Sequence, residues 1–308
     1  MTTTSTTRPV VVGVDGLPGS AGAVRYAVAA ARRSGAALRL LHVVPGVLSL
    51  GPAAPMVDLK QIGAELLADA ERTARELAPD LEVQTVLTCG ERTSGMRKAA
   101  EGAQLLVIGR ESRRGVERLI TGTATANVAA HAPCEVAVVP SFWLDEDVHG
   151  RVVVGIKSGR DSHELLSQAF KEAASRGGSL RIVTAWQVAD PYFDRVEVRT
   201  HADEWERHGI RLLDEITAEW RAAYPDVALE VKVVHGPAAR VLLGESGDAD
   251  LLVVSRRRLA LPPYGQLGGV GHDLLRLSDV PVLVVPYAAD APNPEEELVL
   301  EEAGAPVK

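Results

Sequence analysis

The chain has 308 residues, of which 46% are apolar, 24% are charged and only 4% are aromatic, and it carries a formal net charge of −8. This balance suits two ordinary globular domains whose cores consist mainly of Val, Leu and Ala. The apolar runs are far shorter than the roughly 20 residues of a membrane span, the Thr-rich start lacks the pattern of a signal peptide and no basic surface stands out, so we expect a cytoplasmic protein without membrane or nucleic-acid partners.

The N-terminal half alternates short β-branched runs with amphipathic segments. Ser20 can cap a first helix whose apolar residues recur at helical spacing, and residues 59–77 predict a second helix of nearly five turns. Short apolar runs predict five strands, at residues 9–14, 38–43, 82–87, 105–108 and 136–139. Strands that alternate with helices are typical of an α/β fold, an open parallel five-stranded sheet with helices on both faces.

The C-terminal half repeats this order about 140 residues later. Its strands are predicted at residues 152–156, 180–185, 229–234, 251–254 and 282–285. A period near 140 is too long for a solenoid repeat and is typical of a duplicated globular domain. We therefore expect domain 1 at residues 9–140 and domain 2 at residues 151–287.

The segments outside the two domains have their own compositions. Residues 288–308 hold six acidic residues and one lysine, a charge of −5, which leaves −3 for the rest of the chain. We expect this acidic tail and residues 1–8 to be disordered. The linker at residues 141–150 contains Phe142 and Trp143, whose rings we expect to pack against a domain.

Asp15 is the first candidate binding residue, because it directly follows the first strand and precedes Gly16. In open parallel sheets, ligands bind beyond the carboxyl ends of the strands, where the strand order reverses. A carboxylate there can accept hydrogen bonds from a ribose or a base, or hold a water or a metal. Asp is also common before Gly because it caps the turn, and position alone leaves both interpretations open.

A second candidate follows the fourth strand of domain 1, where Gly109 lets the chain turn off the strand. Gly122, Thr123 and Thr125 would begin the next helix, whose free N–H groups favour an anion. The two threonine hydroxyls can donate to phosphate oxygens. The alternative is that Thr123 caps the helix without any ligand.

The strand order, these residues and the Val-Val-Pro that closes each copy resemble the universal stress protein family. Its ATP-binding members carry an Asp after the first strand and the pattern Gly-x2-Gly-x9-Gly-Ser/Thr after the fourth. Gly109, Gly122 and Thr123 match this pattern, whereas Ser112 occupies the position of the middle glycine. The resemblance covers about residues 8–140 and 150–287 and implies two Rossmann-like domains of the adenine-nucleotide-binding type.

The resemblance implies ATP in domain 1, with or without Mg²⁺. Its adenine would lie near Asp15 and Val43, and its phosphates would lie against Gly109, Gly122, Thr123 and Thr125. Ser112 either hinders the close approach of the backbone to the phosphates or donates its hydroxyl to them.

Domain 2 departs further from the pattern. Lys157 replaces the Asp, and Ser255 and Arg258 occupy the two early glycine positions. Gly268 and Gly269 keep the last glycine but lose the hydroxyl. We therefore expect no ATP there; the arginines at residues 256–258 either bind a different phosphorylated ligand or form a solvated loop.

The leading hypothesis is a stress-response signalling protein that binds ATP in domain 1, with a degenerate domain 2. Related dimers join through their last strands, so we expect residues 136–139 and 282–285 to make that contact inside one chain; a homodimer and a protein partner remain open. The alternatives are a nucleotide-free scaffold and a slow ATP hydrolase, for which Asp15 and Glu111 are the candidate bases. The histidines lack metal-ligand spacing, and Cys89 and Cys134 form no CxxC pair, so we assign no catalytic or metal residue.

Overall fold

The computed structural model describes residues 7–45, 58–110, 123–145, 149–157, 162–256 and 267–286. All ten predicted strands are present, each within two residues of the predicted bounds. The strands are β1 (Val10–Gly13), β2 (Leu38–Val44), β3 (Val83–Cys89), β4 (Leu105–Arg110), β5 (Glu135–Pro140), β6 (Arg151–Gly155), β7 (Ser179–Trp186), β8 (Ala228–His235), β9 (Leu251–Ser255) and β10 (Val282–Val285). The helices are α1 (Pro18–Ser34), α2 (Leu59–Leu77), α3 (Arg92–Ala100), α4 (Thr123–His131), α5 (His163–Ser175), α6 (Pro191–Ala223), α7 (Ala238–Glu245) and α8 (Gly268–Leu277).

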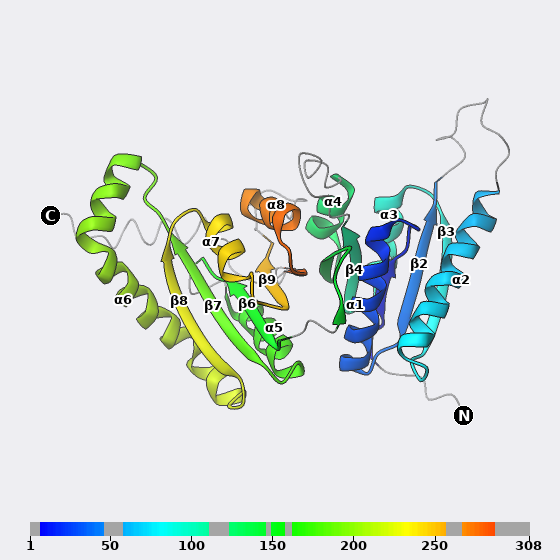
Figure 1. Cartoon of the computed structure of the whole chain (residues 1–308), viewed down its shortest axis with the longest axis horizontal. Helices are drawn as coiled ribbons and strands as arrows, with labels where there is room; N and C mark the ends of the chain where they lie inside the picture. The colour runs from blue at the N-terminus through cyan, green and yellow to red at the C-terminus, as the bar shows by residue number, and fades with distance from the viewer. Residues whose placement is uncertain are drawn as a thin grey trace.

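The strands form one ten-stranded sheet in the order β3-β2-β1-β4-β5-β10-β9-β6-β7-β8. Within each domain the neighbouring strands are parallel, as predicted, whereas β5 and β10 pair antiparallel. Ala137 lies opposite Leu283, with Val136 opposite Val284 on one side and Val138 opposite Val282 on the other. The last strands therefore join the two domains inside one chain, and Figure 1 shows the domains on either side of this junction.

Helices cover both faces of the sheet because side chains alternate along each strand. Val10 and Val12 of β1 point to the face that α1, α2, α5 and α6 cover, and Val11 points to the face that α3, α4, α7 and α8 cover. Val, Leu and Ala make up most of both cores, as the composition predicts. The long α6 extends along the outer strand β8 (Figure 1).

Two local expectations are corrected. Helix α1 begins at Pro18 with Leu17 as its N-cap residue, so Ser20 lies in the first turn and is not the cap. Proline suits the start of a helix because the N–H that it lacks would have no helical partner there. In the linker, the Trp143 ring packs on Tyr26 with centroids 5.2 Å apart, as expected, but Phe142 is exposed.

The predicted disordered ends fall largely or wholly outside the described residues. The described residues begin at Thr7 and end at residue 286. Within the described part of the chain, none of the helices has the length and apolar character needed to cross a membrane.

Candidate functional site

The strand order reverses once in each domain, between β1 and β4 in domain 1 and between β6 and β9 in domain 2. Strands on the two sides of such a point send their connections to opposite faces, which leaves a crevice at the carboxyl edge. Asp15 follows β1 and Gly109 lies at the end of β4, so both residues lie at the domain 1 crevice. Lys157 and Arg256 follow the equivalent strands of domain 2.

The Asp15 carboxylate caps the turn that enters α1. Its Oδ1 accepts hydrogen bonds from the Leu17 N–H and the Ser20 hydroxyl, both at 3.0 Å. Its Oδ2 lies 3.8 Å from Nη1 of Arg92, at the start of α3. The turn-capping interpretation is therefore confirmed, but the side chain is still 30% exposed, and its Oδ2 carries only this long ion pair among the contacts of the described residues.

Gly109 is needed for packing, whatever the ligand. A Cβ atom at this position would lie 2.2 Å from the Gly19 carbonyl oxygen and 3.0 Å from the Ser20 nitrogen. The first turn of α1 therefore rests directly on the end of β4, and this contact brings Gly109 and Asp15 together through Ser20. The sequence alone predicts for Gly109 only a turn and a contact with phosphate.

The end of β2 lies beside the end of β1 at the same carboxyl edge of the sheet. Val43 is buried, and its side chain packs so closely on α3 that a Cβ atom at Gly95 would lie 2.9 Å from it. The neighbouring His42 is also buried, and its Nδ1 lies 2.7 Å from the Val14 carbonyl oxygen, directly before Asp15. His42 is thus a packed histidine that ties β2 to β1.

The structure places the remaining predicted residues only in part. Ser112 and Gly122 lie outside the described residues. Thr123 is the first residue of α4, and Thr125, half-buried, lies in the first turn of that helix. The described residues therefore bring together Asp15, Gly109 and the end of β2.

In domain 2, the prediction of a solvated arginine loop is wrong for Arg256. This side chain is buried, and its guanidinium donates to the carbonyl oxygens of Ala132 and Cys134 at 2.6 and 3.0 Å. Burial lowers the pKa of Arg256 to about 10, so the guanidinium remains charged at neutral pH. Arg257 and Arg258 lie outside the described residues, whereas Lys157 is exposed.

Domain 2 also holds a His–Asp pair that the sequence did not predict. Nε2 of His235 lies 2.9 Å from Oδ1 of Asp194, which also accepts the Val188 N–H, and these hydrogen bonds lower the pKa of Asp194. The His235 ring contacts Trp186 edge-on, with centroids 4.6 Å apart. The pair fixes the start of α6 over the ends of β7 and β8, and its 41-residue separation gives no sequence signal.

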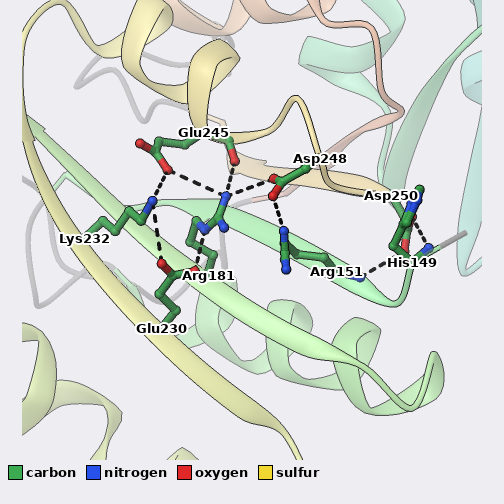
Figure 2. Close-up of polar contacts among 8 residues, drawn as sticks. All are labelled: His149, Arg151, Arg181, Glu230, Lys232, Glu245, Asp248 and Asp250. Atoms are coloured by element: carbon green, nitrogen blue, oxygen red, sulfur yellow. Dashed lines mark hydrogen bonds and ion pairs between the residues drawn. The ribbon is translucent and has the colours of Figure 1, made fainter.

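A charged network crosses β6, β7 and β8 of domain 2, and Figure 2 shows its side chains. Arg181 donates to Glu230 at 2.7 Å, to Asp248 at 3.0 Å and to the Glu245 carbonyl oxygen at 2.8 Å, and Lys232 donates to the Glu245 carboxylate at 2.8 Å. Each of these cations faces carboxylates, so the network ties the strands to α7. Across the described ranges, no group of three or more His, Cys, Asp or Glu side chains is arranged to hold a metal ion.

The model of the Universal stress protein family matches residues 6–140 and 149–286. Universal stress protein Rv2005c of Mycobacterium tuberculosis is 29% identical over 89% of this chain and 96% of its own. A universal stress protein structure from Archaeoglobus fulgidus covers 92% of this chain and 100% of its own, with 15% identity and a TM-score of 0.69. A universal stress protein solved in complex with cAMP matches 43% of this chain and 96% of its own, with 22% identity and a TM-score of 0.35.

Proposed function

Because the chain belongs to the universal stress protein family and contains two of its domains in tandem, we propose that it binds ATP at the carboxyl edge of domain 1 and acts in stress signalling. The observation that carries this proposal is the difference between the two crevices. Domain 1 presents a partly exposed carboxylate, Asp15, where domain 2 presents an exposed cation, Lys157. The same fold therefore offers opposite charges to a ligand at its two equivalent positions.

An adenine nucleotide suits the groups at the domain 1 crevice. Its ribose hydroxyls can donate to Oδ2 of Asp15, which faces only Arg92 among the described residues, at 3.8 Å. Its phosphates are anionic and suit the N–H groups at the start of α4, which have no acceptor within the helix. Thr125 in the first turn of this helix adds a hydroxyl that can donate to a phosphate oxygen.

We assign the site to binding rather than to turnover. Asp15 is the described candidate base, and its Oδ1 already accepts two hydrogen bonds that cap α1. A carboxylate held in this way serves recognition better than proton transfer, which needs a base within reach of the attacking group. A weak ATP hydrolase remains the less favoured alternative.

A nucleotide-free scaffold is the second candidate function. The same contacts of Asp15 favour it, because Leu17, Ser20 and Arg92 give the carboxylate partners without any ligand. The ATP-binding and scaffold functions differ in one contact. In the first, Oδ2 of Asp15 accepts a hydrogen bond from a ribose hydroxyl, and in the second it keeps only its ion pair with Arg92 among the described residues.

Titration calorimetry of Mg-ATP into the nucleotide-stripped full-length chain tests the proposal. We expect one site per chain, binding weakened by about tenfold or more in Asp15→Asn, and unchanged binding in Lys157→Gln, the matched variant at the equivalent position. Repeating the titration with ATP and a chelator shows whether Mg²⁺ takes part. A wild-type protein that binds no ATP up to millimolar concentration overturns ATP binding and leaves the scaffold.

A further inference from the structure

Arg110 and Arg256 occupy equivalent positions in the two domains. Arg110 is the last residue of β4, and Arg256 directly follows β9, the equivalent strand of domain 2. Both side chains are buried, with 5% and 8% of their surface exposed. A buried guanidinium is costly unless acceptors surround it, so each arginine must have partners in a defined place.

Both arginines find partners in the opposite domain. Arg110 donates from Nη1 to the Arg276 carbonyl oxygen at 2.5 Å and from Nη2 to the Ser278 carbonyl oxygen. Arg256 donates to the carbonyl oxygens of Ala132 and Cys134. Arg276 lies in the last turn of α8 and Ser278 directly follows that helix. Ala132 directly follows α4, and Cys134 lies between α4 and β5. Each arginine therefore contacts the C-terminal end of the last helix of the other domain.

The acceptors explain why arginine occupies these positions. The last carbonyl groups of a helix lack helical partners and carry the negative end of its dipole, which favours a cation. The guanidinium fork can donate to two carbonyl oxygens at once, which a lysine ammonium cannot do with the same geometry. Figure 1 shows α4 and α8 on either side of the junction that these contacts cross.

The positions of the arginines also join the junction to both crevices. Arg110 directly follows Gly109, which contacts the turn that Asp15 caps. Its partners Arg276 and Ser278 lie at the end of α8, the helix that begins at Gly268 after the domain 2 crevice. A displacement at one crevice is therefore connected, through one buried side chain, to the last helix of the other domain.

We propose that Arg110 and Arg256 couple the two domains reciprocally, each linking the carboxyl edge of its own domain to the final helix of the other. We call these contacts of Arg110 and Arg256 with the opposite domain the arginine clasp. The clasp forms in the protein without any nucleotide. Its use in transmitting ligand occupancy from domain 1 to α8 rests on the proposed function.

Hydrogen exchange of the full-length chain without nucleotide tests the clasp. In Arg110→Met, we expect amides at residues 276–280 of domain 2 to exchange about tenfold faster or more, because the carbonyl groups beside them lose a charged donor. In Arg256→Met, the same increase should appear at residues 131–135 of domain 1. Arg97→Met, which alters an exposed arginine on α3, is the matched control and should change neither segment.

The crosswise pattern separates coupling from simple destabilisation. Faster exchange confined to the mutated domain, or equally faster exchange throughout both domains, overturns the proposal. If Arg110→Met does not fold, Arg110→Lys is measured instead; it keeps the charge but not the fork, and should give a smaller increase at the same remote segment.

Adding Mg-ATP extends the experiment to ligand transmission. We expect slower exchange at residues 13–20 and 276–280 of the wild type, with the second effect lost in Arg110→Met. Slower exchange at residues 13–20 alone overturns transmission while leaving ATP binding intact. An absence of any ATP effect contradicts the proposed function, whereas the nucleotide-free comparison still decides the clasp.

Discussion

Gln168 of α5 donates a hydrogen bond to Oε2 of Glu135 on β5, with 2.8 Å between the two atoms, so a polar pair joins the two domains on the face opposite the arginine clasp. Burial raises the pKa of Glu135 to about 7, and the negative charges of Glu172 and Glu164 add to this effect while Lys171 opposes it. Glu172 itself pairs with Arg176, whose guanidinium reaches the Tyr26 hydroxyl of domain 1 at 3.4 Å. The interface therefore holds an acid, Glu135, that titrates near neutral pH.

The first prediction concerns the pH dependence of stability. The folded pKa of Glu135, about 7, lies above its ordinary value of 4.5, so folding favours the protonated acid. This contribution is fully present below pH 4.5 and is lost as the pH rises through about 7, at a cost of up to about 3 kcal/mol. Glu135→Gln should be more stable than the wild type at pH 8 and close to it at pH 5.

Urea denaturation of both proteins at pH 5 and pH 8 checks this prediction. Glu101→Gln, at an exposed position, is the control and should follow the wild type at both values. A Glu135→Gln protein with the same pH dependence as the wild type would show that this carboxyl group titrates normally in the folded state.

The second prediction concerns the charged network of domain 2 (Figure 2). The Arg181 side chain is only 10% exposed and contacts three carboxylates, those of Glu230, Glu245 and Asp248. Arg181→Met removes the one cation that contacts all three of these carboxylates, and leaves Lys232 beside Glu230 and Glu245 and Arg151 beside Asp248. We expect a loss of about 2–4 kcal/mol in the free energy of unfolding, because breaking a partly buried charge network leaves uncompensated charge.

Arg221→Met is the matched control, because Arg221 also pairs with a carboxylate, Asp214, but both side chains are almost half exposed. Its loss should cost less than about 1 kcal/mol. Chemical denaturation measures both variants. Equal effects would mean that the Arg181 network contributes no more than an ordinary surface ion pair.

The third prediction separates packing from phosphate binding at Gly109. Gly109→Ala places a methyl group 2.2 Å from the Gly19 carbonyl oxygen, a backbone atom that cannot move without shifting α1. We expect a loss of about 2 kcal/mol or more in the nucleotide-free protein. Gly244→Ala, in a helix and with nothing within 4 Å, should keep or increase stability. A stable Gly109→Ala protein would return Gly109 to the role of a ligand residue alone.

Local patterns made most of the fold predictable. Val10 to Val12 and Val152 to Val154 are buried β-branched runs, and such runs form strands wherever a sheet can cover both of their faces. The pairing of residues 136–139 with residues 282–285 was predicted from the family resemblance, which implies that last strands join, and the repeat supplies both strands in one chain. Equivalent edge strands can pair in this way about a two-fold axis. The carboxyl edge could also be predicted, because the carboxyl ends of parallel strands lie at the same edge of a sheet.

The contacts that depend on distant residues could not be predicted. Arg256 was predicted to lie in a solvated run of arginines. Its acceptor Ala132 is 124 positions away, so no local pattern indicates the contact. Gly109 was predicted only to form a turn beside phosphate. Its contact with Gly19 arises only when α1 packs on β4, so the sequence does not indicate it. Ser20 was predicted to cap the first helix. In the structure Asp15 caps a turn and α1 begins at Pro18, an arrangement that also depends on the packing of α1 on β4.

The last prediction distinguishes the two roles of Asp15, the turn cap and the proposed ligand for ribose. Ser20→Ala removes a hydroxyl that donates to Asp15 and that also lies 2.7 Å from the Leu17 carbonyl oxygen, so it weakens the cap while leaving the carboxylate in place. Both Ser20→Ala and Asp15→Asn should lose about 1 kcal/mol of stability. Only Asp15→Asn should lose ATP affinity, by about tenfold or more, because only that variant removes the charged acceptor. Thermal melts and titrations of the same samples measure both quantities. Equal losses of affinity in the two variants would mean that Asp15 acts on the site through the shape of the turn, and that its carboxylate does not contact the nucleotide.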